Sequence, residues 1–153
     1  MRLDSHGKRC KGFSTKDIAM KELLMFAPFG RYLGVQALEV GNGFSRIRLP
    51  YRTELTNPAG KLHGGVIASV ADIAMAVAIG SVLGGKPGRH STVKLEIKYK
   101  AAVTDGEIIA EAKVIRRKQT VFLGETVIKN GTGQVVAIAT ATFMVRDNAS
   151  QGE

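Results

Sequence analysis

The stretch that decides the fold runs from Asn57 to Gly80 and reads NPAGKLHGGVIASVADIAMAVAIG. From Val66 to Leu83 apolar residues fill all faces of a helix, and no proline interrupts the run before Pro87. A helix that is apolar all round is buried in the interior of a protein. The sequence therefore predicts a long central helix with the rest of the chain folded around it.

Asp72 is the single charged residue of this helix. Ionised side chains are almost never fully buried without a partner or a task, so the carboxylate requires an explanation. Most positions one or two turns away on the same face are small, namely Gly65, Ala68, Ser69 and Ala76, whereas Met75 and Ile79 are bulky. Another backbone or a slender ligand could therefore approach Asp72. Tight helix packing would explain the small residues about as well, but it would not explain the acid.

The 22 residues from Gly64 to Gly85 are also long enough to suggest a transmembrane helix. An aspartate in mid-span costs about 2.5 to 3.5 kcal/mol on insertion scales, and the sequence offers no second span. A central helix enclosed by a sheet is the better interpretation, and we expect no membrane partner.

The composition, with 153 residues of which 44% are hydrophobic and 23% charged, is that of a globular protein. We expect one domain over residues 14–147, between a basic N-terminal tail over 1–13 and a polar C-terminal tail over 148–153. No apolar stretch follows the basic residues of the first tail, so we expect neither a signal peptide nor an anchor, and a cytoplasmic location. Cys10 is the only cysteine, and no metal-ligand spacing is present. We therefore predict no metal, no cofactor and no thiol-based mechanism.

The formal charge of +9 raises the question of nucleic-acid binding. The excess lies in residues 1–16, with five basic and one acidic residue, and in residues 86–118, with nine and four. Aromatic residues make up only 6% of the chain and Trp is absent, which leaves no obvious stacking platform for bases. A localised basic rim suits a smaller polyanion, and we do not expect nucleic acid as a partner.

The segments around the central helix carry the signals of one short helix and several strands. Ser14 or Thr15 is expected to cap a helix that runs to about Phe26 and ends at Pro28. Strands are predicted over residues 33–40, 44–49, 92–100, 107–116, 120–129 and 134–146. In the strand after the central helix, the residues expected on one face are Val93, Leu95, Ile97 and Tyr99.

Turn signals join these strands in sequence. Gly41-Asn42-Gly43 and Asn130-Gly131 are expected to form hairpins, and the four strands after the helix are expected to form a meander. The predicted fold class is therefore α+β, with one antiparallel sheet folded around one helix.

Asn57, the triplet His63-Gly64-Gly65 that begins six residues later, and Asp72 nine residues after His63 form a recognisable pattern. This pattern resembles the signature of the hotdog-fold acyl-CoA thioesterases of the phenylacetic acid degradation (PaaI) type. The resemblance covers roughly residues 20–146 and includes the strand order and Thr92 shortly after the helix. It implies a hotdog fold, in which an antiparallel sheet wraps around the central helix, and hydrolysis of thioesters.

The resemblance also implies a role for each matching residue. The backbone N–H of Gly64 would polarise the thioester carbonyl, Asn57 would help to place the attacking water or the carbonyl, and Asp72 would act as general base or nucleophile. Thr92 matches a position where a Ser or Thr assists in some members. His63 is a candidate base, although such a residue more often holds the loop.

The physical chemistry of a helix start agrees with these roles. Unpaired N–H groups and the positive end of the helix dipole stabilise negative charge on a carbonyl oxygen, and only glycine lets a thioester come so close. A Gly-Gly turn before a helix and an Asn-Pro turn are the structural alternatives for Gly64 and Asn57. Two positions differ among relatives: Asp72 replaces the Glu of another hotdog branch, and Lys94 stands where many relatives have an acidic residue.

Hydrolysis of a small, medium-chain or aromatic acyl-CoA to the free acid and CoA is the leading functional hypothesis. The alternative is a non-catalytic acyl-CoA binding or sensing protein, which would need the fold but not Asp72. Basic residues could receive the phosphates of CoA at the mouth of the site. The candidate substrate-binding residues are Gly65, Ser69, Met75, Lys86, Arg89, Arg116, Arg117 and Lys118.

Helix geometry predicts that two chains share each site. Asp72 follows Gly64 by eight residues, which places them roughly 12 Å apart along one helix. A base, its water and the attacked carbonyl must fit within successive contacts of roughly 3 Å. Two such helices packed antiparallel across a two-fold axis would bring each Asp72 towards the Gly64 of the other chain. The resemblance implies such a homodimer, assembled further as a dimer of dimers; the alternative is a site within one chain with a base from a loop.

Overall fold

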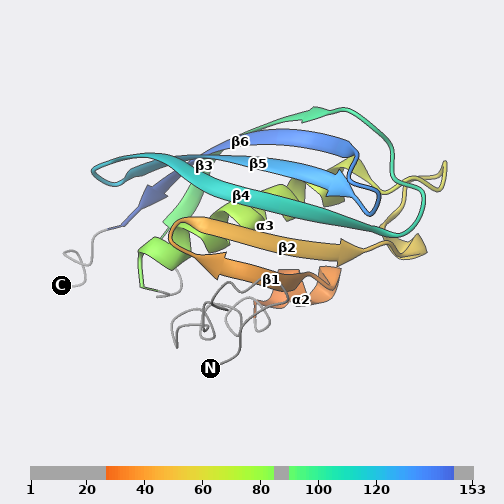
Figure 1. The fold of residues 1–153 in the computed structure, drawn as a ribbon, viewed down its shortest axis with the longest axis horizontal. Coiled ribbons are helices and arrows are strands. Elements are labelled where there is room, and N and C mark those ends of the chain that lie inside the picture. The colour runs from red at the N-terminus through yellow and green to blue at the C-terminus, as the bar shows by residue number, and fades with distance from the viewer. Residues whose placement is uncertain (1–26, 85–89, 147–153) are drawn as a thin grey trace, which may run out of the picture.

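The computed structural model describes residues 27–84 and 90–146. The two predicted tails and the helix predicted before Pro28 lie outside these ranges. In chain order, the elements are α2 (Pro28–Leu33), β1 (Gln36–Gly41), β2 (Phe44–Pro50), the short 3-10 helix η1 (Thr53–Leu55), α3 (Gly64–Val82), β3 (His90–Tyr99), β4 (Glu107–Lys118), β5 (Val121–Asn130) and β6 (Val135–Val145). The strands form one antiparallel sheet in the order β1-β2-β4-β5-β6-β3, and α3 lies against one of its faces (Figure 1). The predicted α+β fold, with a sheet wrapped around a central helix, is confirmed.

Helix α3 supplies most of the contact between the two layers. Its buried side chains are Ile67, Val70, Ala71, Ala74, Met75, Val77, Ala78 and Ile79. Two buried hydroxyl groups of the sheet also reach the helix backbone: Ser45 donates to the Ala74 carbonyl at 2.6 Å, and Thr126 donates to the Ala71 carbonyl at 3.4 Å. Because a buried hydroxyl group needs a partner, these two bonds favour one position of the helix on the sheet.

The same helix is long and apolar enough to cross a membrane, judged by length and composition alone. Half of its most apolar window is buried inside the fold. The core helix of a globular protein passes the same test, and α3 has the sheet packed against it as the sequence predicted.

The hairpin of β1 and β2 forms at the predicted turn. Asn42 and Gly43 have φ values of 51° and 76°. A two-residue type I′ hairpin requires positive φ at both central positions, which Asn and Gly tolerate best. The alternation of β2 then places Ile47 and Leu49 in the core, fully buried.

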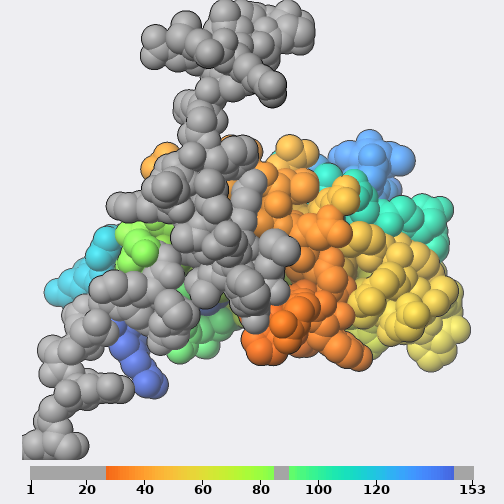
Figure 2. Space-filling view, turned by 90° about the horizontal axis from the view of Figure 1, so that it is seen from below, coloured from red at the N-terminus to blue at the C-terminus, as the bar shows by residue number. Residues whose placement is uncertain are grey.

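The segment before β1 differs from the prediction. Leu33 was expected to begin a strand, but it ends the short helix α2, and the strand starts at Gln36. Pro28 stands in the first turn of α2, where its fixed φ and missing N–H are tolerated. Arg52 holds the end of this helix by donating to the carbonyl oxygens of Tyr32 and Leu33 at 3.1 and 2.9 Å. Figure 2 shows the orange surface of α2 and β1 next to the yellow surface of the segment that precedes α3.

The predicted meander of four strands is wrong in one respect. β4, β5 and β6 do follow one another across the sheet, but β3 pairs with β6 and not with β4. β4 pairs instead with β2, so β3 is an edge strand. Consecutive strands are neighbours only about two-thirds of the time, and the turn signals of the sequence do not reveal the exceptions.

A bulge at Val93 divides β3 into two parts with opposite alternation. The register with β6 shifts there, and Val93 is 61% exposed instead of facing the helix as predicted. After the bulge, Leu95 and Ile97 pack against the core; before it, Thr92 faces α3. One extra residue in a strand reverses the faces of all residues beyond it, which explains the error.

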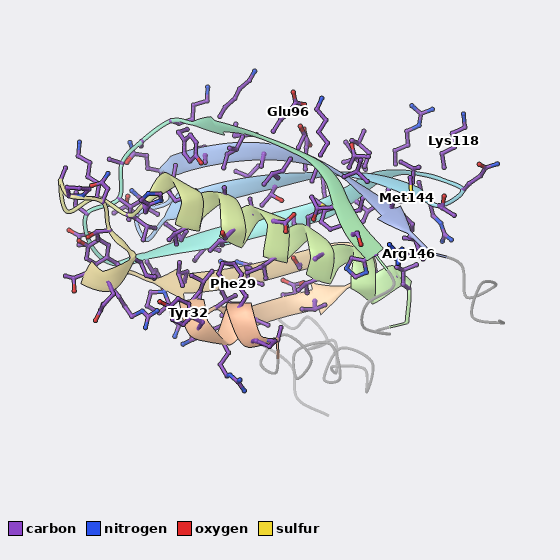
Figure 3. All side chains as sticks on the ribbon, turned by 180° about the vertical axis from the view of Figure 1, so that it is seen from behind. Phe29, Tyr32, Glu96, Lys118, Met144 and Arg146 are labelled. Carbon is purple, nitrogen blue, oxygen red and sulfur yellow. The ribbon has the colours of Figure 1, made fainter. Side chains whose placement is uncertain are left out.

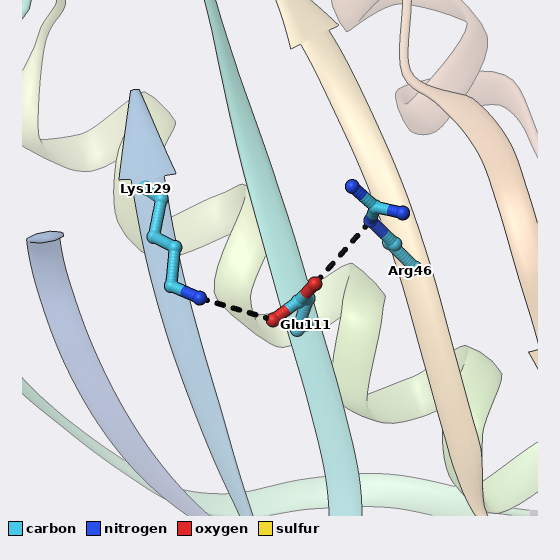
Figure 4. Close-up of polar contacts among 3 residues, drawn as sticks. All are labelled: Arg46, Glu111 and Lys129. Atoms are coloured by element: carbon cyan, nitrogen blue, oxygen red, sulfur yellow. Dashed lines mark hydrogen bonds and ion pairs between the residues drawn. The ribbon is translucent and has the colours of Figure 1, made fainter. Parts of the chain in front are cut away.

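The outer face of the sheet, away from α3, carries ion pairs across three strands. Glu111 of β4 lies 3.3 Å from Arg46 of β2 and 3.5 Å from Lys129 of β5 (Figure 4). The Arg46 contact is an ion pair without the alignment of a hydrogen bond. Since these side chains are partly exposed, each pair stabilises the fold by about 0 to 1 kcal/mol.

Candidate active site

The side of α3 that the sheet leaves open carries Asp72 in a row of small residues. Gly65, Ser69 and Ala76 lie along this row and are exposed or half-buried, as is Asp72 itself. From the edge strand β3, Thr92 donates its hydroxyl hydrogen to Asp72 Oδ1 at 2.7 Å. The other oxygen of the carboxylate, Oδ2, has no hydrogen-bond partner among the residues that the structure describes. The site therefore holds a carboxylate that is oriented on one side and open on the other.

The first turn of α3 presents a free amide at Gly64. His63 caps the helix: its Nδ1 accepts from the Gly65 N–H at 2.9 Å, and its carbonyl accepts from Val66 and Ile67. The N–H of Gly64 has no acceptor within residues 27–84 and 90–146, and Gly64 is half-buried. Because Nδ1 of His63 is engaged in the cap, the geometry favours the loop-holding role of this residue over that of a base.

Asn57 forms the turn that leads to the helix. Its Oδ1 accepts from the N–H groups of Ala59 and Lys61 at 3.0 and 3.1 Å, and its own N–H donates to the Lys61 carbonyl at 2.8 Å. This is the bonding pattern of an Asx turn. The side-chain oxygen of Asn57 therefore has the turn-forming role that was the structural alternative to a catalytic one. The Nδ2 amide group has no acceptor in the described part of the chain, which leaves two donor hydrogens for a carbonyl or a water.

Tyr99, at the end of β3, contacts the start of α3 and is not among the predicted site residues. Its hydroxyl group donates to the Gly64 carbonyl oxygen at 2.7 Å, and half of the side chain is exposed. One partial signal for this contact is present in the sequence, since a tyrosine that alternates with Leu95 and Ile97 has a hydroxyl group for which a partner is expected. The position of β3 beside α3, which shows that the partner is the helix start, could not be inferred.

His90, at the other end of β3, was also missed. Its ring packs on Phe143 of β6, with 5.8 Å between the ring centroids. Burial lowers the pKa of His90 below its ordinary value, against the opposing effects of the nearby Ala76 backbone and of the negative charge of Asp72. A neutral imidazole therefore lies near the Asp72 carboxylate at neutral pH.

The basic residues expected to receive phosphate groups do not form one cluster. Arg116 and Lys118 lie on the outer face of the sheet, where they line an open groove of about 520 Å³ together with Gln119, Val121, Leu123 and Thr142. Lys118 lies at the same end of the sheet as Met144 (Figure 3). Arg117 points to the other face, with its guanidinium carbon 4.9 Å from the centre of the Phe122 ring. Lys86 and Arg89 lie outside the described residues.

The remaining substrate-binding candidates divide between the open row and the core. Gly65 and Ser69 belong to the row, and the Ser69 hydroxyl group donates to the Gly65 carbonyl at 2.8 Å. Met75 is fully buried, with its thioether against Gly124 of β5. Met75 is thus a core residue of this chain, and its expected place along the substrate is corrected.

Asp72 and Gly64 are eight residues apart on the same helix, α3. Within one chain, Thr92 therefore contacts the Asp72 carboxylate, but the carboxylate does not lie next to the free N–H of Gly64. No group of three or more His, Cys, Asp or Glu that could hold a metal ion occurs among the described residues.

A model of the thioesterase superfamily matches residues 59–137, from the Asn57 turn to β6. The chain belongs to the thioesterase superfamily. A protein of Archaeoglobus fulgidus named "Putative esterase" is 33% identical to it over 113 residues, which cover 72% of this chain and 70% of the other. Protein PA5202 of Pseudomonas aeruginosa, a solved structure, is 29% identical with a TM-score of 0.75 over 81% of this chain and 98% of that one.

Among the solved structures similar to this thioesterase-superfamily member is the E. coli PaaI protein from the phenylacetic acid degradation operon. It aligns with a TM-score of 0.75 at 19% identity, over 87% of this chain and 97% of the other. An identity this low establishes the fold alone. Together with the family match, it confirms the hotdog fold and the resemblance that was based on Asn57, His63-Gly64-Gly65 and Asp72.

Proposed function

We propose that this thioesterase-superfamily member hydrolyses small, medium-chain or aromatic acyl-CoA to the free acid and CoA. The observation that carries the proposal is the 2.7 Å hydrogen bond from Thr92 to Asp72. It orients a carboxylate on the open row of a helix that carries no other charge, which is the placement that a general base requires. Membership of the superfamily supports a hydrolase that acts on thioesters.

In the proposed reaction, Asp72 accepts a proton from a water molecule whose oxygen attacks the thioester carbonyl carbon. The carbonyl oxygen becomes negative and accepts a hydrogen bond from the Gly64 N–H, at the positive end of the α3 dipole. The C–S bond then breaks, and the CoA thiolate leaves and takes up the proton that Asp72 received from the water. Asn57 Nδ2 is free to hold the water or the carbonyl oxygen. If Asp72 were the nucleophile instead, its acyl anhydride would form first and water would hydrolyse it.

The proposed site is completed by a second chain. Gly64 and Asp72 are roughly 12 Å apart along α3, too far to act on one carbonyl. Among residues 27–84 and 90–146, β3 is an edge strand beside the open row, so a partner that joins at this edge would reach both residues. We therefore propose a homodimer in which Asp72 of one chain faces Gly64 and Asn57 of the other. The dimer of dimers and the cytoplasmic location remain predictions from the sequence.

Arg116 and Lys118 are proposed to receive the phosphates of CoA. Neither side chain has an ion-pair partner in the part of the chain that is described, and both line the same groove. A guanidinium and an ammonium group at such a groove suit a diphosphate and a 3′-phosphate.

The proposed activity is tested with a panel of acyl-CoA thioesters, with a thiol reagent to detect released CoA. Release by the wild-type protein and its loss in Asp72→Asn would support the proposal. Binding of acyl-CoA without any release would instead support the non-catalytic alternative.

The shared site is tested by mixing two inactive variants, Asn57→Ala and Asp72→Ala, after reversible dissociation. Random mixing makes about half of the dimers mixed, and each mixed dimer has one intact site, so roughly a quarter of the wild-type activity should return. A mixture that stays inactive although subunit exchange is demonstrated would place the whole site in one chain.

A further inference from the structure

The edge strand β3 contacts α3 at both points of the proposed chemistry. Thr92 bonds to Asp72, and seven residues later Tyr99 bonds to the carbonyl oxygen of Gly64 at 2.7 Å. The phenol also lies beside Gly64: a β-carbon added at that position would be 3.4 Å from the ring Cζ and the hydroxyl oxygen. Tyr99 therefore restrains Gly64 through a hydrogen bond, and its ring stands next to the glycine.

Such a restraint matters because of where Gly64 stands. It is the first residue of α3, and helix ends fray. Glycine also has more backbone freedom than any other residue. An amide that stabilises a developing oxyanion is effective only if it is held in position before the reaction, since reorienting it would cost part of the stabilisation.

We propose that Tyr99 is a positioning residue that holds Gly64 so that its N–H points at the thioester carbonyl oxygen. This inference rests on the proposed function, in which that N–H is the carbonyl donor. Tyr99 acts through Gly64 and makes no contact with the reacting atoms. Its hydroxyl group holds the carbonyl oxygen of Gly64, and the backbone geometry of that residue orients the Gly64 N–H.

Tyr51 offers a matched control. Its hydroxyl group donates to the carbonyl oxygen of Gly60 at 2.8 Å, so Tyr51→Phe also removes one bond from a tyrosine to a glycine carbonyl. The turn that contains Gly60 keeps its own bonds, including Gly60 N–H to the Asn57 carbonyl at 2.9 Å. A general loss of rigidity before α3 would therefore affect both variants, whereas a positioning effect on Gly64 would affect Tyr99→Phe alone.

The test measures kcat and KM of both variants, together with the order parameter of the Gly64 amide by 15N relaxation. Loss of a whole oxyanion donor costs about 10² to 10³ in rate, so loosening it in Tyr99→Phe should lower kcat roughly tenfold, with KM within about twofold of wild type. The Gly64 order parameter should fall in Tyr99→Phe. Tyr51→Phe should leave both kcat and the Gly64 order parameter unchanged.

Three outcomes would overturn the inference. With an active wild-type protein, an unchanged kcat and an unchanged Gly64 order parameter in Tyr99→Phe would leave the proposed function intact but refute the role of Tyr99. A higher KM at unchanged kcat would make Tyr99 a substrate contact instead. If the wild-type protein releases CoA from no thioester, the proposed function fails, and the positioning role fails with it even if Gly64 becomes more mobile.

Discussion

The bond between Thr92 and Asp72 permits a quantitative prediction, because one residue is expected to act only through the other. Asp72→Asn keeps the shape of the side chain but cannot take a proton from water, and general-base catalysis contributes about 10² to 10⁴ in rate. Thr92→Val keeps the shape of Thr92 but removes the 2.7 Å bond to Oδ1. A hydrogen bond to a charged group stabilises by about 1.5 to 3 kcal/mol, and the partial exposure of this pair favours the lower end. We therefore expect Thr92→Val to lower kcat about tenfold.

The double variant distinguishes this model from two independent roles. If Thr92 only orients the carboxylate, the double variant should be about as active as Asp72→Asn alone, because no ionised acid remains to be oriented. The assay is CoA release under saturating substrate, with circular dichroism to establish that all variants fold. A double variant about tenfold slower than Asp72→Asn would mean that Thr92 acts separately from the acid, and near-wild-type activity of folded Asp72→Asn would refute the assignment of the base.

Three further predictions concern stability and substrate binding. Gly124→Ala should lower the free energy of unfolding by about 1 to 3 kcal/mol, since a β-carbon would overlap the thioether beneath it; Gly131→Ala, where only an ordinary contact arises, is the control in denaturant melts. Because burial lowers the pKa of His90 in the folded state, the unfolded chain binds more protons below about pH 6.5 and stability should fall on acidification through that range. His90→Gln should flatten this slope in melts at about pH 5 and pH 7.5. Charge reversal of Arg116 and Lys118 should raise KM for acyl-CoA more than it lowers kcat and should reduce the salt dependence of KM; unchanged values would exclude the groove as the phosphate site.

Much of the fold was predictable because its signals are local. The apolar run of α3 and the Asn42-Gly43 turn each specify their own conformation, and both formed where expected. The place of β3 beside β6 was not predictable, since no residue of β3 indicates which of several strands it will join. The helix at Pro28 differs from the prediction for a local reason: proline can end one helix, but it is equally suited to the first turn of another.

The candidate site residues on α3 could be predicted from their residue types and their positions in the helix. The residues that contact α3 from the strands could not. Asp72 and Gly64 were selected as an acid in an apolar helix and a glycine at a helix start. Tyr99 and His90 reach α3 only because of the strand order and the bulge, so their contacts depend on long-range pairing. Arg117 was grouped with its neighbours in sequence, although a second register shift in β4 and the alternation of the strand direct it to the opposite face.

The bulge at Val93 also determines how the specificity of this protein could be altered by directed evolution. A library that assumes simple alternation would randomise Val93 and the other odd-numbered residues of β3 as the positions that face α3. The Val93 side chain points to solvent, so variants at this position would not change the site. The positions beside α3 follow two different parities, with His90 and Thr92 before the bulge and Tyr99 after it. For the same reason, deletion of one residue at the bulge would restore continuous alternation and carry Thr92 away from Asp72 without any change in the identity of either residue.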